Sequence, residues 1–507
     1  MVKNVVGYLS ASVKKYSKKT VCADDDTQMS YQELWDVSHT ISGNLLSYVK
    51  PLSPVPVLMK KSCAAFSLMW GIIKAGSCYV MIDPMLPKER INSILKTLEA
   101  KIVIIEDEKI RNKLPENLQV IQYELLYKEI KASQIEEVDE RIASICDVDP
   151  LYIMFTSGST GVPKGVVVNH RSVVDFIDAF VETFQITADE IIGNQAPWDF
   201  DVSVKDIFSA VKVGATIQFI SKKYFSLPLQ LAELLQQKKV TTLIWAVSAL
   251  CILSSKGILE KAAPSNIRKV IFSGEVMPVV QFNIWKRTYP NAMFVNVYGP
   301  TEITCNCTYC ILEREYSEED LLPIGKAFPN ERVFLLNEDD ELISDAMAEV
   351  VGEICVAGTA VTCGYYNASE ETKRHFTQNP LQNKYHEIIY RTGDLAYYNA
   401  EKELLFVGRR DFQIKHMGHR IELSEIERVL YSLFDVRQAC CIFCENEIVA
   451  FVAAEDVDKK TILGELRKKL PQYMVPSKLL ILSELPLNKN GKVDRKLLNE
   501  HFRATKD

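Results

Sequence analysis

The stretch that most constrains this chain is residues 152–165, which read YIMFTSGSTGVPKG and pass from an apolar run into a string of hydroxyls and glycines. Apolar, β-rich residues flank it on both sides, so we expect a loop between two buried strands instead of a linker between domains. Glycines let the backbone approach a polyanion, hydroxyls donate hydrogen bonds, and Lys164 adds positive charge. The stretch therefore predicts a phosphate-holding loop.

The loop only half meets the nucleotide-binding P-loop pattern. Gly158 and Lys164 have the correct spacing, but Pro163 stands where that pattern has its second glycine and Gly165 where it has a hydroxyl residue. We therefore expect a loop of another design.

Composition bounds the class of protein. A chain of 507 residues with 47% hydrophobic residues exceeds one core, so two or more domains are expected. A formal net charge of −7 argues against a general nucleic-acid binder, because no surplus of cations exists to displace counterions. The longest apolar run, residues 243–253, is shorter than the roughly 20 residues that cross a bilayer. We expect a globular protein with no membrane span.

The cysteines and the N-terminus bear on the compartment. The 13 cysteines are scattered, and no signal-peptide pattern follows Met1, so free thiols in a reducing cytoplasm are expected. Neither cysteine cluster, at 305–310 or at 440–444, has the paired spacing or the histidine partner of a structural zinc site. We expect a cytoplasmic protein without structural zinc.

Alternating patterns in the first 140 residues predict parallel α/β layers. Helical periodicity at 31–46 and 88–98 alternates with strand patterns at 57–59 and 101–106. Further along, apolar strands end at the glycine turns 273–275 and 298–299, and the ends of parallel strands are where ligands collect.

Asp201 precedes a helical pattern whose apolar positions begin at Val204. Asp201 can be the N-cap or a dipole partner of that helix, which would stabilise the helix by about 1 kcal/mol, or its carboxylate can bind the ammonium group of a ligand. Lys205 lies four residues later on the same helix face, so it can form an i,i+4 ion pair with Asp201. If that face lines a pocket, both charges become ligand contacts.

The strand end at 293–297 is followed by Tyr298, a tight turn, Thr301 and Glu302. A tyrosine can stack on a flat base, a threonine can bond a phosphate oxygen, and a glutamate can hold a divalent cation. Further on, Asp394 could accept hydrogen bonds from two ribose hydroxyls.

The pattern changes after Gly408 to a compact α+β order, which predicts a core at 1–408 and a lid domain at 412–507, with the boundary at 409–411. Within the lid, a helix is expected to begin at Ser424, with Glu427 completing a capping box. Near the end, Lys492 follows a glycine in a polar turn, which by itself is typical of an ordinary surface loop.

Together, and in this order over nearly the whole chain, these motifs resemble the adenylate-forming superfamily of acyl-CoA synthetases, luciferases and amino-acid adenylation domains of nonribosomal peptide synthetases. The resemblance implies an α/β fold. A large N-terminal domain of two βαβ-type subdomains plus a β-barrel would carry a small mobile α+β C-terminal lid that turns about Asp411.

The resemblance also implies an ATP site with Mg²⁺. Tyr298 would stack on adenine, Asp394 and Arg409 would hold the ribose, Thr301 would contact the α-phosphate and Glu302 would bind the metal. Lys492 would enter for adenylation and leave for thioester formation. The residues that would close over the ATP phosphates are Thr156, Ser157, Gly158, Ser159, Thr160 and Lys164.

Within the superfamily, the segments 194–201, 273–275 and 418–423 look like those of amino-acid activators. Asp201 matches the position that binds the α-ammonium of the substrate. The positions that the resemblance places around the amino acid are Asp201, Val202, Lys205, Ile244, Ile271, Ser273, Gly274, Val297, Cys305 and Asn306.

The implied reaction makes an aminoacyl-AMP from ATP and an amino acid, releases pyrophosphate, and transfers the aminoacyl group to a phosphopantetheine thiol. Because no carrier domain follows Arg495, a separate carrier protein is expected, and a monomer is favoured. Stand-alone D-alanine:carrier-protein ligases read similarly, but Ser273 and Lys205 depart from their pattern. Lys205 would favour a substrate with a carboxylate or carboxamide side chain, unless Lys205 forms an ion pair with Asp201 or Asp206.

Two other interpretations stay open. An acyl-CoA synthetase that uses another carboxylic acid is disfavoured by Asp201. An inactive homologue that serves as a binding module would be expected to have lost Lys164, Glu302, Asp394 or Lys492, and all four are present.

Overall fold

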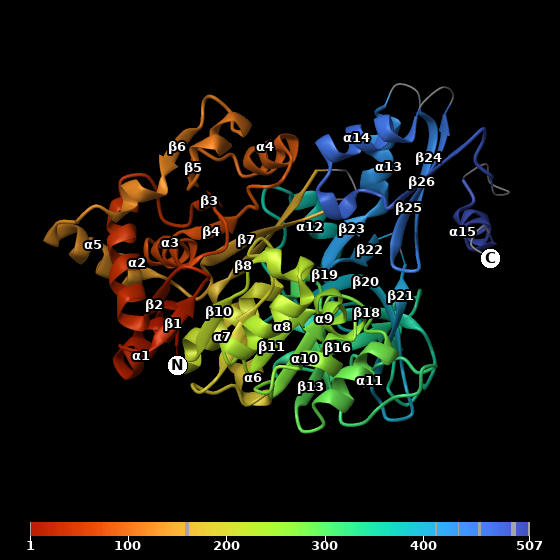
Figure 1. Cartoon of the computed structure of the whole chain (residues 1–507), viewed down its shortest axis with the longest axis horizontal. Coiled ribbons are helices and arrows are strands. Elements are labelled where there is room, and N and C mark those ends of the chain that lie inside the picture. The colour runs from red at the N-terminus through yellow and green to blue at the C-terminus, as the bar shows by residue number, and fades with distance from the viewer. Residues whose placement is uncertain are drawn as a thin grey trace.

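The computed structural model describes residues 2–157, 162–410, 413–433, 436–454, 458–487 and 493–504. Sheets with helices on them form a large N-terminal part, and a smaller α+β part follows at the C-terminal end (Figure 1). The α/β fold with a large N-terminal and a small C-terminal domain, expected from the sequence, is confirmed. The boundary at 409–411 stays a prediction.

The first sheet has the strand order β6-β5-β3-β4-β7-β8 and is parallel except for the final β7–β8 hairpin. Its helices match the expected ones at 31–46 and 88–98 to within one residue. The strands are β3 (Pro54–Leu58), β4 (Cys78–Met81), β5 (Ile102–Ile105), β6 (Gln119–Gln122), β7 (Pro150–Thr156) and β8 (Lys164–Asn169), and the helices are α2 (Tyr31–Leu45), α3 (Cys63–Lys74), α4 (Lys88–Thr97) and α5 (Ala132–Ser144).

The second sheet has the order β15-β14-β13-β12-β11-β9-β10-β1-β2. The N-terminal strand β1 pairs in parallel with β10, so the start of the chain completes a sheet formed mostly by residues after 190. The strands are β1 (Thr20–Ala23), β2 (Gln28–Ser30), β9 (Ile191–Asn194), β10 (Thr216–Phe219), β11 (Thr242–Ala246), β12 (Lys269–Ser273), β13 (Met293–Tyr298), β14 (Thr308–Ile311) and β15 (Lys326–Ala327).

Helices accompany the second sheet, and α7, the helix after Asp201, packs against α1 and α6. These helices are α1 (Val6–Tyr16), α6 (His170–Thr183), α7 (Val202–Val213), α8 (Pro228–Gln237), α9 (Val247–Ser254), α10 (Ile258–Ala262) and α11 (Val279–Thr288).

A third, antiparallel sheet follows in the region that the resemblance assigns to a barrel. Its strands, with one helix, are β16 (Glu331–Leu336), β17 (Leu342–Ile343), β18 (Gly352–Gly358), β19 (Phe376–Gln378), β20 (Ile388–Tyr398), β21 (Leu404–Arg409) and α12 (Ser369–His375).

The C-terminal elements, blue in Figure 1, form a hairpin and a small sheet of order β24-β25-β26 with helices. They are β22 (Gln413–His416), β23 (His419–Glu422), α13 (Leu423–Tyr431), β24 (Val436–Cys444), β25 (Glu447–Ala454), α14 (Lys459–Lys469), β26 (Lys478–Leu482) and α15 (Arg495–Ala504).

The expected capping box of α13 is wrong. The helix begins at Leu423, one residue before Ser424, and no side chain caps it. Glu427 instead accepts hydrogen bonds from the backbone N–H of Cys441, at 2.6 Å, and from Arg495, at 2.9 Å. The Glu427 carboxylate therefore bonds to residues of β24 and α15 instead of to the start of its own helix.

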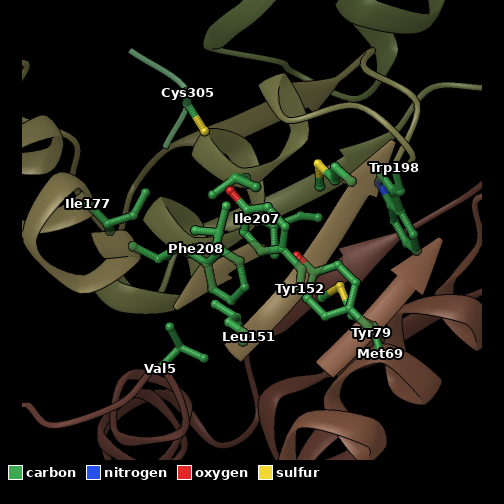
Figure 2. Packing of buried hydrophobic residues seen from close by; sticks show 14 of the residues in the cluster. Val5, Met69, Tyr79, Leu151, Tyr152, Ile177, Trp198, Ile207, Phe208 and Cys305 are labelled. Carbon is green, nitrogen blue, oxygen red and sulfur yellow. The ribbon is translucent and has the colours of Figure 1, made fainter. Parts of the chain in front are cut away.

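A hydrophobic core joins the first two sheets. Figure 2 shows Val5, Met69, Ile177 and Phe208, from α3, α6, α7 and the N-terminus, converging on one cluster. Tyr152 of β7 packs beside Tyr79 of β4, with ring centroids 5.6 Å apart. The strand that leads into the 152–165 loop is therefore packed into this core.

All 13 cysteines lie within the described residues and carry free thiols. Across the described part of the chain, no helix is long and apolar enough to cross a membrane.

Candidate active site

Strands β7 and β8 lie on either side of the loop, as expected, and they pair in antiparallel fashion with Thr156 opposite Lys164. Ser157, at the end of β7, donates a hydrogen bond to the Arg420 carbonyl at 2.7 Å and accepts one from the Glu422 N–H at 3.2 Å. The loop therefore contacts β23 of the C-terminal domain. Gly158, Ser159 and Thr160, predicted to hold phosphate, lie outside the described residues.

Lys164, predicted to bind phosphate, forms an ion pair with Glu371 of α12. Both side chains are mostly buried, and the ammonium also lies 5.4 Å from the ring centroid of Tyr365. The positive charge expected for ATP is thus held by a protein carboxylate.

A cavity of about 330 Å³ lies at the ends of β12 and β13, within the range of small-molecule sites. It is lined from the large domain by Gly274, Tyr298 and Arg409 and from the C-terminal domain by Lys415 and Phe443, among others. The cavity therefore lies between the two domains. Its lining includes Tyr298 and Arg409, which the resemblance assigns to the adenine base and the ribose.

Asp394 connects two residues predicted for the nucleotide. The Tyr298 hydroxyl donates to one oxygen of Asp394 and Arg409 donates to the other. Lys415 lies 5.0 Å from the Tyr298 ring centroid. Since each carboxylate oxygen has two lone pairs, Asp394 keeps acceptor capacity for ribose hydroxyls.

Glu302, the predicted Mg²⁺ ligand, is 1% exposed and lies just beyond β13. Arg420 donates to both of its oxygens, and the Tyr365 hydroxyl donates to Oε1 at 2.7 Å. Burial by itself raises the pKa of Glu302, but the charge of Arg420 and the hydrogen bond from Tyr365 bring it below its usual value. The carboxylate is held ionised.

Glu302 fits a magnesium site of one particular kind. The described residues contain no group of three or more His, Cys, Asp or Glu side chains that could hold a metal. Mg²⁺ commonly uses one or two carboxylates together with substrate phosphates, and Glu302, one ionised, buried carboxylate four residues after the cavity-lining Tyr298, meets that requirement.

Asp201 lies at the start of α7, 5% exposed, with helical backbone angles and no hydrogen bond from its side chain to the helix end. The expected cap is therefore wrong. The hydroxyl of Thr301 bonds to the carboxylate instead. Burial raises the pKa of Asp201, opposed by that hydrogen bond and by the charge of Lys205.

Lys205 does not form the i,i+4 ion pair with Asp201. Its ammonium donates to Asn306 Oδ1 at 2.7 Å and to Ser273 Oγ at 3.1 Å. Asp206 points elsewhere and accepts a hydrogen bond from Asn194 at 2.6 Å. Lys205, Ser273 and Asn306, three of the predicted pocket positions, are thus brought together.

The remaining predicted pocket positions lie on α7, on strands β11 to β13 and in the turns that follow β12 and β13. Cys305 donates its thiol to the Asp201 carbonyl at 3.1 Å. Gly274 and Val297 line the cavity, and Gly274 has a left-handed φ of +92° that disfavours any other residue. The fully apolar members, all buried, are Val202, Ile244, Ile271 and Val297.

Four residues of the site were not singled out by sequence reasoning: Arg420, Tyr365, Lys415 and Glu275. Glu275 accepts from the Gly418 N–H at 3.1 Å and from the Ser248 N–H at 2.9 Å, so it joins the β22–β23 turn to α9. The sequence signals were the segments 273–275 and 418–423, which contain Glu275 and Arg420. The predicted hinge Asp411 and the predicted catalytic Lys492 lie outside the described residues.

The site thus consists of a cavity of small-molecule size between a large α/β domain and a small α+β domain. Two buried carboxylates, Asp201 and Glu302, are the neighbours of Thr301. The chain belongs to the AMP-binding enzyme family, which it matches over residues 9–366, and it matches the AMP-binding enzyme C-terminal domain over residues 425–492. The resemblance seen in the sequence is confirmed.

The chain is also similar to individual known proteins. The chain is 30% identical to tyrocidine synthase 3 of Brevibacillus parabrevis across 94% of its own length, but it spans only 7% of that synthase. Its fold resembles the Vibrio cholerae adenylation domain AlmE in complex with glycyl-adenosine-5'-phosphate, with a TM-score of 0.84, 22% identity and coverage of 99% and 98%. It also resembles NpsA-ThdA, an artificially fused adenylation-PCP di-domain NRPS from Klebsiella oxytoca, with a TM-score of 0.81, 20% identity and 94% coverage of both chains.

Proposed function

We propose that this chain activates an amino acid with ATP as an aminoacyl-AMP and then transfers the aminoacyl group to the phosphopantetheine thiol of a separate carrier protein. Membership of the AMP-binding enzyme family supports the first step. The relatives named as an adenylation domain with glycyl-adenosine-5'-phosphate and as an adenylation-PCP fusion support the choice of an amino acid and a carrier.

The observation that carries the amino-acid part is the environment of Asp201. Its carboxylate is buried, bonds to Thr301 and has no cation within ion-pair distance among the described residues. A buried carboxylate is costly unless a cation joins it. The α-ammonium of an amino acid supplies that cation, whereas a simple carboxylic acid, as in an acyl-CoA synthetase, does not.

In the first step, an oxygen of the amino-acid carboxylate forms a bond to the α-phosphorus of ATP, and the bond to the pyrophosphate oxygen breaks. We assign Thr301, whose hydroxyl would then leave Asp201, to an α-phosphate oxygen, and we assign Glu302 to Mg²⁺. The metal supplies neutralising charge for the phosphates. We assign Lys492 to the same neutralisation, and Tyr298, Asp394 and Arg409 to the nucleoside.

In the second step, the carrier thiolate attacks the acyl carbon, the C–S bond forms, and the bond from that carbon to the AMP oxygen breaks. Both steps need the C-terminal domain, so we propose that it turns about residues 409–411. D-alanine remains one candidate substrate.

Pyrophosphate exchange into ATP, measured with each amino acid in turn, tests the proposal. Asp201→Asn keeps the size of the side chain but removes its charge, so kcat/KM for the amino acid should fall about 100-fold while ATP binding is retained. Asp206→Asn is the matched control, because Asp206 lies on the same helix and bonds to Asn194 instead of lining the site.

Two results would contradict the proposal. Exchange supported by unsubstituted carboxylic acids but by no amino acid would favour an acyl-CoA synthetase. Exchange with neither, in protein that still binds ATP, would favour a binding module. Transfer to the carrier is tested separately by loading of a phosphopantetheinylated carrier from labelled amino acid.

A further inference from the structure

Lys205 is the most unusual residue of the predicted pocket, because it places a buried positive charge among positions that, apart from Asp201, are neutral or apolar. Its side chain, on α7, is 1% exposed. Around it, Ile244 and Ile271 are fully buried and Val297 is 1% exposed. A lysine held at such depth without a charged partner is rare and calls for a physical reason.

The hydrogen bonds of Lys205 go to neutral groups. Asn306 Oδ1 and Ser273 Oγ accept two of its N–H bonds, at 2.7 and 3.1 Å. An ammonium has three N–H donors, so a third remains for another acceptor. These two contacts orient the ammonium but leave its charge uncompensated, and burial lowers the pKa of Lys205.

The neighbouring acids do not supply that compensation at contact distance. Among the described residues no carboxylate lies within the 4.0 Å of an ion pair with Lys205. Asp201 bonds to Thr301, and Asp206 bonds to Asn194. Both acids act on Lys205 only through longer-range attraction.

On the basis of the proposed amino-acid activation, we infer that the substrate carries a carboxylate on its side chain and that Lys205, oriented by Ser273 and Asn306, binds it. The α-ammonium would lie at Asp201, one helical turn away on the same face of α7. The side-chain carboxylate of an acidic amino acid would then bind Lys205, and its α-ammonium would bind Asp201.

A carboxylate fits better than the alternatives. A carboxamide oxygen could accept the third N–H bond but would leave the ammonium charge unpaired, and a charged acceptor forms about twice as strong a bond. An alkyl side chain, or the methyl group of alanine, would leave both the charge and the donor unsatisfied.

The test is pyrophosphate exchange by the full chain with aspartate, glutamate and longer dicarboxylic amino acids, in both enantiomers, against asparagine, glutamine and alanine. The native protein should prefer an acidic amino acid over its carboxamide by about 100-fold in kcat/KM. Lys205→Met should lower that ratio by about 100-fold. Lys74→Met, which removes another buried lysine far from the site, should leave the ratio unchanged.

The outcomes separate this inference from the proposed function. A neutral amino acid preferred by the native protein would overturn the inference and leave amino-acid activation standing, and this result needs no variant to fold. An unchanged acid-to-amide ratio in folded Lys205→Met would also overturn it. Exchange with no amino acid would overturn the proposed function and the inference together.

Discussion

Arg420 donates hydrogen bonds to both oxygens of Glu302, at 3.0 and 2.8 Å, across 118 positions of sequence. Arg420 comes from the C-terminal domain and Glu302 from the large one. A cation at Glu302 and the guanidinium of Arg420 would repel each other at such distances. The domain arrangement seen here and metal binding at Glu302 therefore compete.

Removing Arg420 should make metal binding easier. In Arg420→Gln, the Mg²⁺ concentration for half-maximal pyrophosphate exchange should fall by about threefold or more, because the competitor for Glu302 is absent. Arg287→Gln is the control, since Arg287 is exposed and pairs with Glu315 on the surface. An unchanged or higher Mg²⁺ requirement in Arg420→Gln would contradict the competition.

The ion pair between Lys164 and Glu371 predicts opposite effects of its two members on ATP. Lys164→Gln should raise KM for ATP about tenfold, because a charge-assisted phosphate contact is lost. Glu371→Gln should lower it or leave it unchanged, because Lys164 is released. Glu370→Gln, on the same helix but in an exposed pair with Lys373, is the control. Equal increases of KM in both partners would show that the pair acts only structurally.

A second ion pair across the domains, Arg90 with Glu425 at 2.5 Å, is buried. Arg90→Met leaves a buried carboxylate unpaired, which costs about 3–5 kcal/mol and disfavours this arrangement. Since this domain arrangement competes with the metal binding that adenylation needs, we expect it to serve the second step, carrier loading. In Arg90→Met, carrier loading should therefore slow by about tenfold or more, while pyrophosphate exchange changes little. Arg111→Met, in an exposed pair with Glu108, is the control. Equal loss of both half-reactions would refute this division.

Asp206 predicts a pH dependence of stability. Burial raises its pKa from 3.8 to about 7, so the folded protein binds a proton that the unfolded chain releases between these values. Its contribution to stability is present below pH 4 and is lost as the pH rises to about 7. Asp206→Asn should therefore melt a few degrees above the native protein at pH 8 and near it at pH 4. Equal melting differences at both pH values would contradict this assignment.

Local sequence patterns predicted much of the framework. The two strands that flank the loop of residues 156–165 and the helices α2 and α4 follow from apolar patterns and periodicity, which act over a few neighbouring residues. The order of strand ends at Ser273 and Tyr298 also predicted which side chains would gather, because parallel strands end at one edge of the sheet.

Side-chain partners could not be predicted in the same way. Asp201 and Glu427 each had a plausible local role, as a cap and in a capping box, and both bond to residues distant in sequence. Lys205 had a local acidic partner and bonds instead to Ser273 and Asn306. In a buried site, hydrogen bonds across elements outweigh local pairs worth a few tenths of a kcal/mol.

The sequence by itself determined the family, the α/β fold and the set of residues from which a site could be made, because motif order and periodicity are properties of the chain. Only the tertiary structure decided that Arg420 bonds to Glu302 and that Lys205 bonds to Ser273 and Asn306. Those relationships depend on how β23 meets β13 and how α7 meets β12, and no local rule reaches that far.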